Sequence, residues 1–174
     1  IIETATNTLM IGCKNTIIPD DATALGDMAF QHCSGLTSIR IPASVTKIAN
    51  GAFRRCIGLT SIIVDEGNTV YDSRGNCNAL IETATNRLMI GCNNTIIQDD
   101  VTSISDYAFY GCNAFESIII PSGVTTIGQN AFEECISLES IELPESVRSI
   151  GKAAFYNCSA LKSIEIPDSV TILN

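Results

Sequence analysis

Eight cysteines are the residues of this chain with the widest possible chemistry, because thiols form disulfides, bind metal ions and act as nucleophiles. Five of them follow an Ala-Phe pair at one fixed distance: Cys33, Cys56, Cys112, Cys135 and Cys158. A metal site would need histidine or further cysteine side chains nearby, and His32 is the only histidine. A residue type tied to one position of a repeat behaves as a small apolar side chain. We therefore expect these five thiols to be buried, stacked and free.

Serine and aspartate offer two further kinds of site. Five serines share one repeat position, whereas a catalytic triad needs a unique constellation, for which only His32 could serve as the base. The pairs Asp20–Asp21 and Asp99–Asp100 could attract Ca²⁺, but they lack the additional oxygen ligands of a calcium loop. Solvated turns are the favoured interpretation there and at 65–68. The sequence thus predicts no enzyme activity and no metal ion or cofactor.

The Ala-Phe-x-x-Cys signature indicates that the whole chain is built from repeats. It recurs every 23 residues, except for one step of 56 between Phe53 and Phe109, which equals 23 plus 33. Such a period is typical of a solenoid, in which each unit buries apolar residues against its neighbours. We expect one solenoid over 1–174, with short repeats at 19–64 and 98–174 and a long repeat at 65–97. Both ends look truncated from a longer protein, since neither has a polar capping unit.

Each unit predicts two extended segments and a tighter turn. The run L-x-S-I-x-I alternates apolar and polar residues, which indicates a half-buried strand, and the following proline ends it. The run V-T-x-I predicts a second extended segment, and the spacing around Ala-Phe-x-x-Cys favours one or two helical turns. The predicted fold is an α/β solenoid with one parallel, concave sheet of about seven strands. These strands are expected to end at Ile18, Ile41, Val64, Ile97, Ile120, Leu143 and Ile166.

The long repeat occurs twice. Residues 2–21 and 81–100 share 17 identities in 20 at an offset of 79, which indicates a second, higher order of repetition. Two strand-like runs flank Thr83-Ala84-Thr85-Asn86, which predicts an inserted β-hairpin with Glu82 opposite Arg87.

Composition excludes several classes of partner. The net charge is −9, and the ten Lys and Arg residues are scattered singly, which argues against nucleic acid and against anionic membrane surfaces. There is no run of about 18 apolar residues, so no membrane-spanning helix is expected. The oligomeric state stays open.

The period, the strand pattern and the five Ala-Phe-x-x-Cys signatures resemble the BspA-like leucine-rich repeats over essentially the whole chain. The resemblance implies a right-handed solenoid with a parallel sheet on its concave face. It also implies a secreted or surface-attached protein of anaerobic gut or mouth bacteria, a family that includes adhesins for host extracellular proteins. It transfers no ligand, because the family has no shared binding motif.

In the oxidising exterior that this resemblance implies, Cys77 and Cys92 have two possible states. Folding the hairpin between Ala84 and Thr85 brings them opposite one another, within the range of a disulfide that would close a loop of about 15 residues. Cys92 also stands where an apolar strand residue belongs, which favours two reduced thiols.

One residue in each strand is expected to point away from the core, on the concave face. Down the sheet these are Ile17, Arg40, Ile63, Ile96, Ile119, Glu142 and Glu165. Ile63, Ile96 and Ile119 would form a contiguous apolar patch about 5 Å apart, followed by an acidic pair, and such patches usually mark interaction sites. The alternative is that these isoleucines reflect β propensity or are covered by another segment.

Three functions fit this sequence. The first is a non-enzymatic protein-interaction module, in which a rigid sheet presents side chains to a host extracellular partner. The second is a structural spacer without a ligand. Carbohydrate binding is weaker, because there is no Trp and the four Tyr are not on the predicted concave face.

Overall fold

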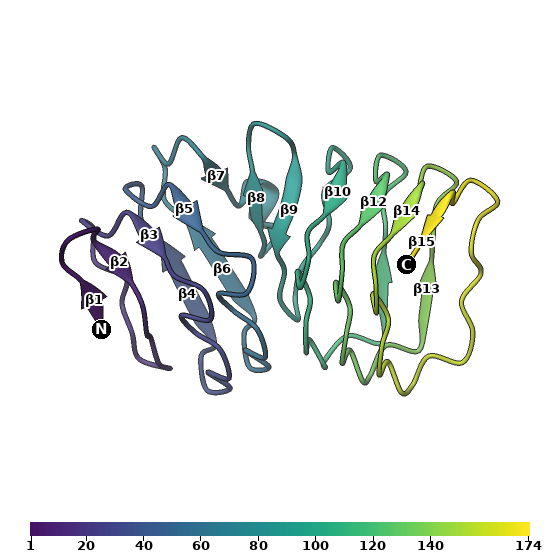
Figure 1. The fold of residues 1–174 in the computed structure, drawn as a ribbon, viewed down its shortest axis with the longest axis horizontal. Helices are drawn as coiled ribbons and strands as arrows, with labels where there is room; N and C mark the ends of the chain where they lie inside the picture. The colour runs from purple at the N-terminus through teal and green to yellow at the C-terminus, as the bar shows by residue number, and fades with distance from the viewer.

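Strands that cross the long axis of the molecule stack into a solenoid, with the N-terminus at one end and β15 near the other (Figure 1). The computed structural model describes all residues, 1–174. The first half contains β1 (Ile2–Glu3), β2 (Thr8–Leu9), β3 (Ala24–Leu25), β4 (Ser38–Ile41), β5 (Lys47–Ile48), β6 (Ser61–Val64) and β7 (Tyr71–Asp72). After the 3₁₀ turn η1 (Arg74–Asn76) come β8 (Leu80–Glu82), β9 (Arg87–Ile90), β10 (Ser103–Ile104), β11 (Ser117–Ile119), β12 (Thr126–Ile127), β13 (Ser140–Glu142), β14 (Ser149–Ile150) and β15 (Ile172–Leu173).

The V-T-x-I runs build the longer sheets. They pair in parallel and in register from coil to coil, as in Ser103↔Thr126 and Ile104↔Ile127. The resulting sheets have the orders β1-β2-β3-β5 and β15-β14-β12-β10-β9-β8-β7. In the two-residue strands the isoleucine or leucine is buried, apart from those of β1 and β15 at the ends of the solenoid, so one side of these sheets faces the core.

The L-x-S-I-x-I runs pair only in twos, which corrects the expectation of one sheet of about seven strands. β4 pairs with β6 and β11 with β13, both in parallel, while the runs at 15–18, 94–97 and 163–166 are not strands. The run 94–97 is diverted by the long repeat: the Ile96 N–H donates to the Cys77 carbonyl, and the Thr95 hydroxyl donates to the Asn78 carbonyl. These groups are therefore not available to β6 or β11.

The segment around Ala-Phe-x-x-Cys is a series of tight turns, which corrects the expected helical turns. Its residue two positions after Phe always has a left-handed backbone, with φ between 58° and 76°: His32, Arg55, Gly111, Glu134 and Asn157. A left-handed residue cannot continue a right-handed helix. The turns instead bond to the adjacent coil, as from Phe109 N–H to the Ala131 carbonyl at 2.7 Å. The chain is thus a β-solenoid with almost no helix, not an α/β solenoid.

Stacked rings and thiols fill the interior at these turns. Phe30 stacks on Phe53, and Phe132 stacks between Phe109 at 4.9 Å and Phe155 at 5.5 Å. Beside them, cysteine thiols donate to the phenylalanine carbonyl of the preceding coil, for example Cys56 to Phe30 O at 3.0 Å and Cys158 to Phe132 O at 3.0 Å. All eight cysteines are free. The five repeat cysteines form what we call the ladder: four of them are buried and Cys33 is half-buried.

The long repeat lies between two hydrophobic cores of 22 and 21 buried residues. β8 and β9 pair antiparallel with Glu82 opposite Arg87, and their charged groups are 3.7 Å apart. A β-bulge between Leu80 and Ile81 shifts the register before the strands reach Cys77 and Cys92. These two thiols consequently bond to separate carbonyls, those of Ala79 and Asn78.

Candidate protein-binding surface

The residues expected to point away from the core form what we call the outer row: Ile17, Arg40, Ile63, Ile96, Ile119, Glu142 and Glu165. All seven are exposed, while their strand neighbours Ile39, Ile62 and Ile141 are buried. The isoleucines are the notable members, with exposed fractions of 82% for Ile17, 52% for Ile63, 65% for Ile96 and 85% for Ile119. No segment of the chain therefore covers them.

Strand pairing fixes part of this row. Arg40 is directly opposite Ile63 across β4 and β6, and Ile119 is opposite Glu142 across β11 and β13. Ile96 belongs to the unpaired run 94–97, between these two small sheets in sequence. The hydrogen-bonded ladder is consequently interrupted on both sides of Ile96, and the contiguous spacing of the three isoleucines stays a prediction.

Arg40 is engaged within the chain. Its guanidinium donates to Asp65 through Nε at 2.7 Å and to Asp20 through Nη1 at 2.8 Å, so it links three successive coils. The hydrogen bond to Asp20, followed by the one to Asp65, raises the pKa of Arg40 above its ordinary value. Sequence reasoning missed this clamp, although an Asp follows the strand run in both flanking coils.

Glu142 and Glu165 line a hollow on the same face. A cavity of about 740 Å³ lies between 139–145 and 162–168. A second cavity of about 410 Å³ lies over β11 and β13, and it shares Ser140, Ile141, Glu142 and Leu143 with the first. The first cavity has five carboxylates on its wall, none of them in an ion pair: Glu139, Glu142, Glu145, Glu165 and Asp168. Lys162 is the one lining cation.

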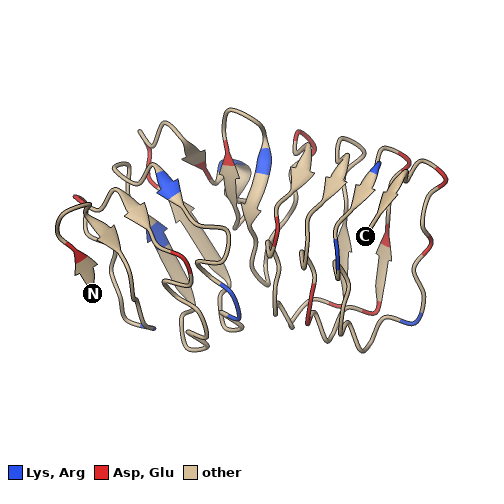
Figure 2. Cartoon of the chain, viewed as in Figure 1, with Lys and Arg blue, Asp and Glu red and all other residues tan.

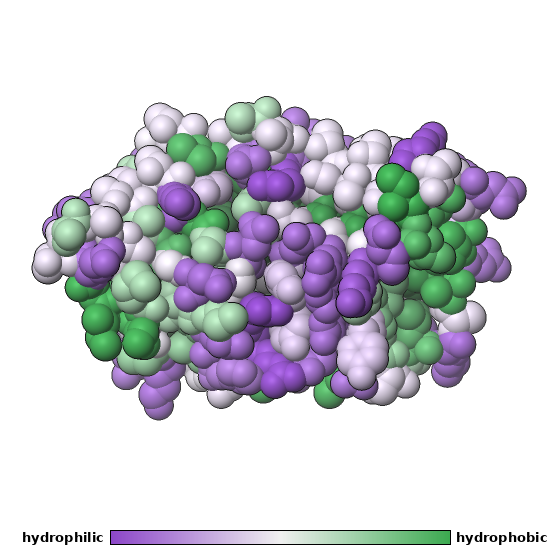
Figure 3. Space-filling view, in the orientation of Figure 1, coloured by the Kyte–Doolittle hydropathy of each residue, from purple (hydrophilic) through white to green (hydrophobic).

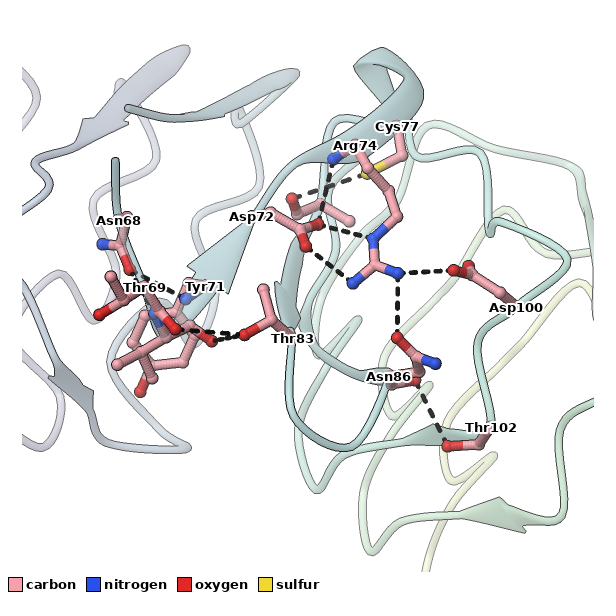
Figure 4. A network of polar contacts seen from close by, with 12 residues as sticks. Asn68, Thr69, Tyr71, Asp72, Arg74, Cys77, Thr83, Asn86, Asp100 and Thr102 are labelled. Carbon is pink, nitrogen blue, oxygen red and sulfur yellow. Dashed lines mark hydrogen bonds and ion pairs between the residues drawn. The ribbon is translucent and has the colours of Figure 1, made fainter. Parts of the chain in front are cut away.

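Arg74 partly neutralises the carboxylates of Asp72 and Asp100. Arg74 donates to Asp72 at 2.7 and 2.8 Å, to Asn86 at 2.9 Å and to Asp100 at 2.5 Å (Figure 4). This network ties η1 to the β8–β9 turn and to the next coil, and sequence reasoning missed it. Asp100 is therefore part of an ion-pair network. The structure contains no group of three His, Cys, Asp or Glu side chains placed to hold a metal ion.

A second cluster of charged and aromatic residues lies at the turns. The Arg54 guanidinium is 3.6 Å from the centre of the Tyr107 ring, and Arg55 is paired with Glu134. A cavity of about 400 Å³ beside it is lined by His32, Asn157 and seven other residues. The charged groups of this cluster have their partners within the chain. Arg54 and Arg55 precede the long repeat and Tyr107 and Glu134 follow it, so these contacts join the coils on either side of it.

Apolar surface also gathers at both ends of the molecule, while hydrophilic side chains occupy the middle of the view (Figure 3). Met10 and Ile11 are exposed near the N-terminus, and Ile172 and Leu173 are exposed near the C-terminus. None of the helical segments has the length and hydropathy needed to cross a bilayer.

Comparison with known structures finds this architecture in other bacterial proteins. A leucine rich cell surface protein from Faecalibacterium prausnitzii has a TM-score of 0.79 and 29% sequence identity, over 99% of this chain and 48% of that one. A leucine-rich repeat protein from Bacteroides ovatus has a TM-score of 0.54 and 30% identity, over 99% and 43%. The pneumococcal vaccine antigen PcpA shares the fold, with a TM-score of 0.75 and 23% identity over 88% and 45%. The chain thus spans about half the length of these structures.

The sequence has no match among curated proteins. Six copies of the family described as BspA type Leucine rich repeat region match residues 8–87 and 87–174. These matches begin within the first copy of the long repeat and continue to the end of the chain, in agreement with the resemblance seen in the Ala-Phe-x-x-Cys signatures. The chain belongs to the BspA type leucine-rich-repeat family.

Proposed function

We propose that this chain is a non-enzymatic protein-interaction module of a secreted or surface-exposed bacterial protein, and that it adheres to host extracellular proteins through the outer row. The observation that carries the proposal is the exposure of Ile63, Ile96 and Ile119. Large apolar side chains in such a row usually mark an interaction surface, because leaving them in water is unfavourable. The surface location is supported by the family and by the Faecalibacterium relative.

The mechanism is presentation. Backbone hydrogen bonds between coils hold the row on a rigid frame, so a partner meets side chains that lose little conformational entropy on binding. Arg40 contributes rigidity through Asp20 and Asp65, while Glu142 and Glu165 remain free to contact a partner. We further infer that the coil is right-handed, as parallel strand crossovers almost always are, that 1–174 is one domain, and that the β8–β9 pair is an insertion into a short repeat.

The test replaces Ile63, Ile96 and Ile119 by Ser together and measures binding to a panel of immobilised, purified extracellular-matrix proteins. We expect the native chain to bind at least one of them, and the triple variant to lose at least tenfold in affinity at an unchanged melting temperature, since the changed side chains are exposed. A matched control replaces three exposed apolar residues away from the outer row, Ile57, Ile136 and Tyr156, by Ser.

Three results would contradict the proposal. Equal binding by the native chain and the outer-row variant would show that the isoleucines are not the contact surface. If no panel member binds, a structural spacer becomes the better interpretation. A lowered melting temperature of the outer-row variant alone would identify the isoleucines as packing residues.

A further inference from the structure

The outer edge of β13 is open. On one side β13 pairs with β11. On the other side lies the run 163–166, which occupies the position of the next strand but shares no backbone hydrogen bond with β13. The same two coils do pair elsewhere, where β14 lies beside β15 with Ser149 opposite Ile172. The last coil is therefore docked on one side of the solenoid and spread away from β13 on the other.

Backbone groups at this edge lack partners. The Ser140 N–H donates toward β11, to the Glu116 carbonyl at 3.3 Å. Since successive residues of a strand direct their N–H and C=O groups to opposite sides, those of Ile141 face the space between β13 and 163–166. An edge with free donors and acceptors is a template for pairing with another extended chain.

The space beside this edge has the size of a peptide site. It is the cavity of about 740 Å³ between 139–145 and 162–168, continuous with the cavity of about 410 Å³ over β11 and β13 through their shared lining residues. Ile119, the most exposed isoleucine of the outer row, lines the smaller of these two cavities and lies directly opposite Glu142. The site therefore combines an open strand edge with an exposed apolar anchor.

Charge selects the occupant. Five unpaired carboxylates and one lysine line the larger cavity: Glu139, Glu142, Glu145, Glu165, Asp168 and Lys162. Figure 2 shows the red segment on β13 and the acidic positions in the coil that follows it. A cationic chain is attracted by these groups, and an anionic one is repelled.

We propose that this groove binds an extended cationic segment of a protein partner, with Lys or Arg at alternate positions, as an added strand on the open edge of β13. The Lys or Arg side chains lie against Glu142 and Glu165, and an apolar side chain of the segment packs on Ile119. This inference rests on the proposed function, because it assigns the partner class to one part of the outer row.

The test uses fluorescence anisotropy with a labelled ten-residue peptide of alternating Lys and Val, a matching peptide of alternating Glu and Val, and a Lys–Val peptide that is N-methylated at alternate residues. We expect the Lys–Val peptide to bind and to weaken with added salt. Substituting Glu142→Gln together with Glu165→Gln should weaken it about fivefold to tenfold. The matched control, Asp21→Asn with Glu66→Gln, removes two exposed carboxylates elsewhere and should leave binding unchanged.

Each of the peptide comparisons can overturn the proposal. Equal binding of the Glu–Val peptide would show that charge does not select the occupant, and equal loss in both double variants would reduce the effect to net charge. Undiminished binding of the N-methylated peptide, both when the Lys residues and when the Val residues carry the methyl groups, would exclude strand addition. Slow hydrogen exchange at the Ser163 and Glu165 amides of the free protein would show that 163–166 itself occupies the edge.

This outcome is separable from that of the matrix-protein assay. If the native chain captures a matrix protein through its isoleucines but ignores the Lys–Val peptide, the groove assignment alone is wrong. If the peptide binds and the isoleucine variant still captures matrix protein, the outer-row function alone is wrong.

Discussion

A buried repeat cysteine such as Cys56, Cys135 or Cys158 is both an apolar and a hydrogen-bonding residue. Its sulfur is buried beside the phenylalanine stack, yet its S–H donates to a carbonyl of the preceding coil, as from Cys135 to Phe109 O at 3.2 Å. Burial raises the pKa of Cys56 to about 12 and that of Cys158 to about 11. At neutral pH these thiols therefore stay protonated, which preserves the donor and suppresses their reactivity.

Cys13 and Cys92 are copies of one residue in opposite environments. Cys92 is buried, and burial raises its pKa. Cys13 is exposed, and the hydrogen bond that the Thr16 hydroxyl donates to its sulfur lowers its pKa. Because the thiolate is the nucleophile, the lowered pKa gives Cys13 more reactive thiolate at a given pH. We expect iodoacetamide to label Cys13 in the native protein, and to do so at a lower pH than it labels an ordinary exposed cysteine.

Mass spectrometry of the native and unfolded protein checks this prediction. Cys56, Cys92, Cys112, Cys135 and Cys158 should become labelled only in the unfolded chain. Thr16→Val should move the pH midpoint for Cys13 upward without changing which residues react. A disulfide between any two members of the ladder, or between Cys77 and Cys92, would contradict the assignment of free thiols.

At the scale of elements, the turn and the ring stack depend on one another. The left-handed residues reverse the chain sharply enough for each Phe to lie over the Phe of the neighbouring coil. Phe132 is fully buried between two parallel rings, at 4.9 and 5.5 Å. Where the long repeat interrupts this order, a glycine replaces the ring: a Cβ on Gly91 would lie 2.1 Å from the Phe109 ring.

Replacing Phe132 by Ala should lower the free energy of unfolding by about 3–5 kcal/mol, because the change leaves a cavity between two rings that the backbone holds apart. Urea denaturation measures the effect. Tyr156→Ala is the control, since it removes an exposed aromatic ring of the adjacent coil and should change stability by less than about 0.5 kcal/mol. A loss below about 1 kcal/mol for Phe132→Ala would mean that the ring contributes no core packing.

The elements that sequence reasoning predicted are those fixed by periodic burial. Spacing alone gave the solenoid and the buried side of the strands, because burial imposes a period on residue type. The turn conformation was predicted wrongly. Non-glycine residues such as His32 and Asn157 adopt positive φ there, and apolar spacing carries no signal for the sign of φ.

The apolar pattern also did not predict how the L-x-S-I-x-I runs pair, because pairing depends on which neighbouring segment forms a hydrogen bond with each backbone N–H and C=O group. Asn68 illustrates a usable signal. It stands where the unit has Val, and its side-chain amide donates to the Pro42 and Val45 carbonyls while its oxygen accepts from Val70 and Tyr71. A polar residue at a core position of the repeat thus marks the start of the long repeat.

For the candidate site, the repeat pattern predicted the exposed outer row. It did not predict the ion pairs of Arg40 with Asp20 and Asp65, because ion pairs between coils are not periodic.

At the scale of the whole molecule, the long repeat joins two cores. Adjacent residues of β8 serve different clusters: Leu80 packs with the N-terminal one and Ile81 with the C-terminal one. On β9, Met89 and Leu88 divide in the same way. In a solenoid, stability is transmitted only between neighbouring coils, so this shared element determines whether the two halves unfold together.

Leu80→Ala and Ile81→Ala test this coupling, because each removes a fully buried side chain from one core only. Each should cost about 2–5 kcal/mol. Since neither core is complete without the β8–β9 pair, we expect both variants to unfold in a single transition. Core amides in 36–48 and in 124–138 should then lose hydrogen-exchange protection together, by about thirtyfold or more in either variant. Ala84→Ser, at the exposed tip of the β8–β9 turn, should change neither. Faster exchange confined to 36–48 in Leu80→Ala and to 124–138 in Ile81→Ala would instead show two independent folding units, with the long repeat as a hinge between them.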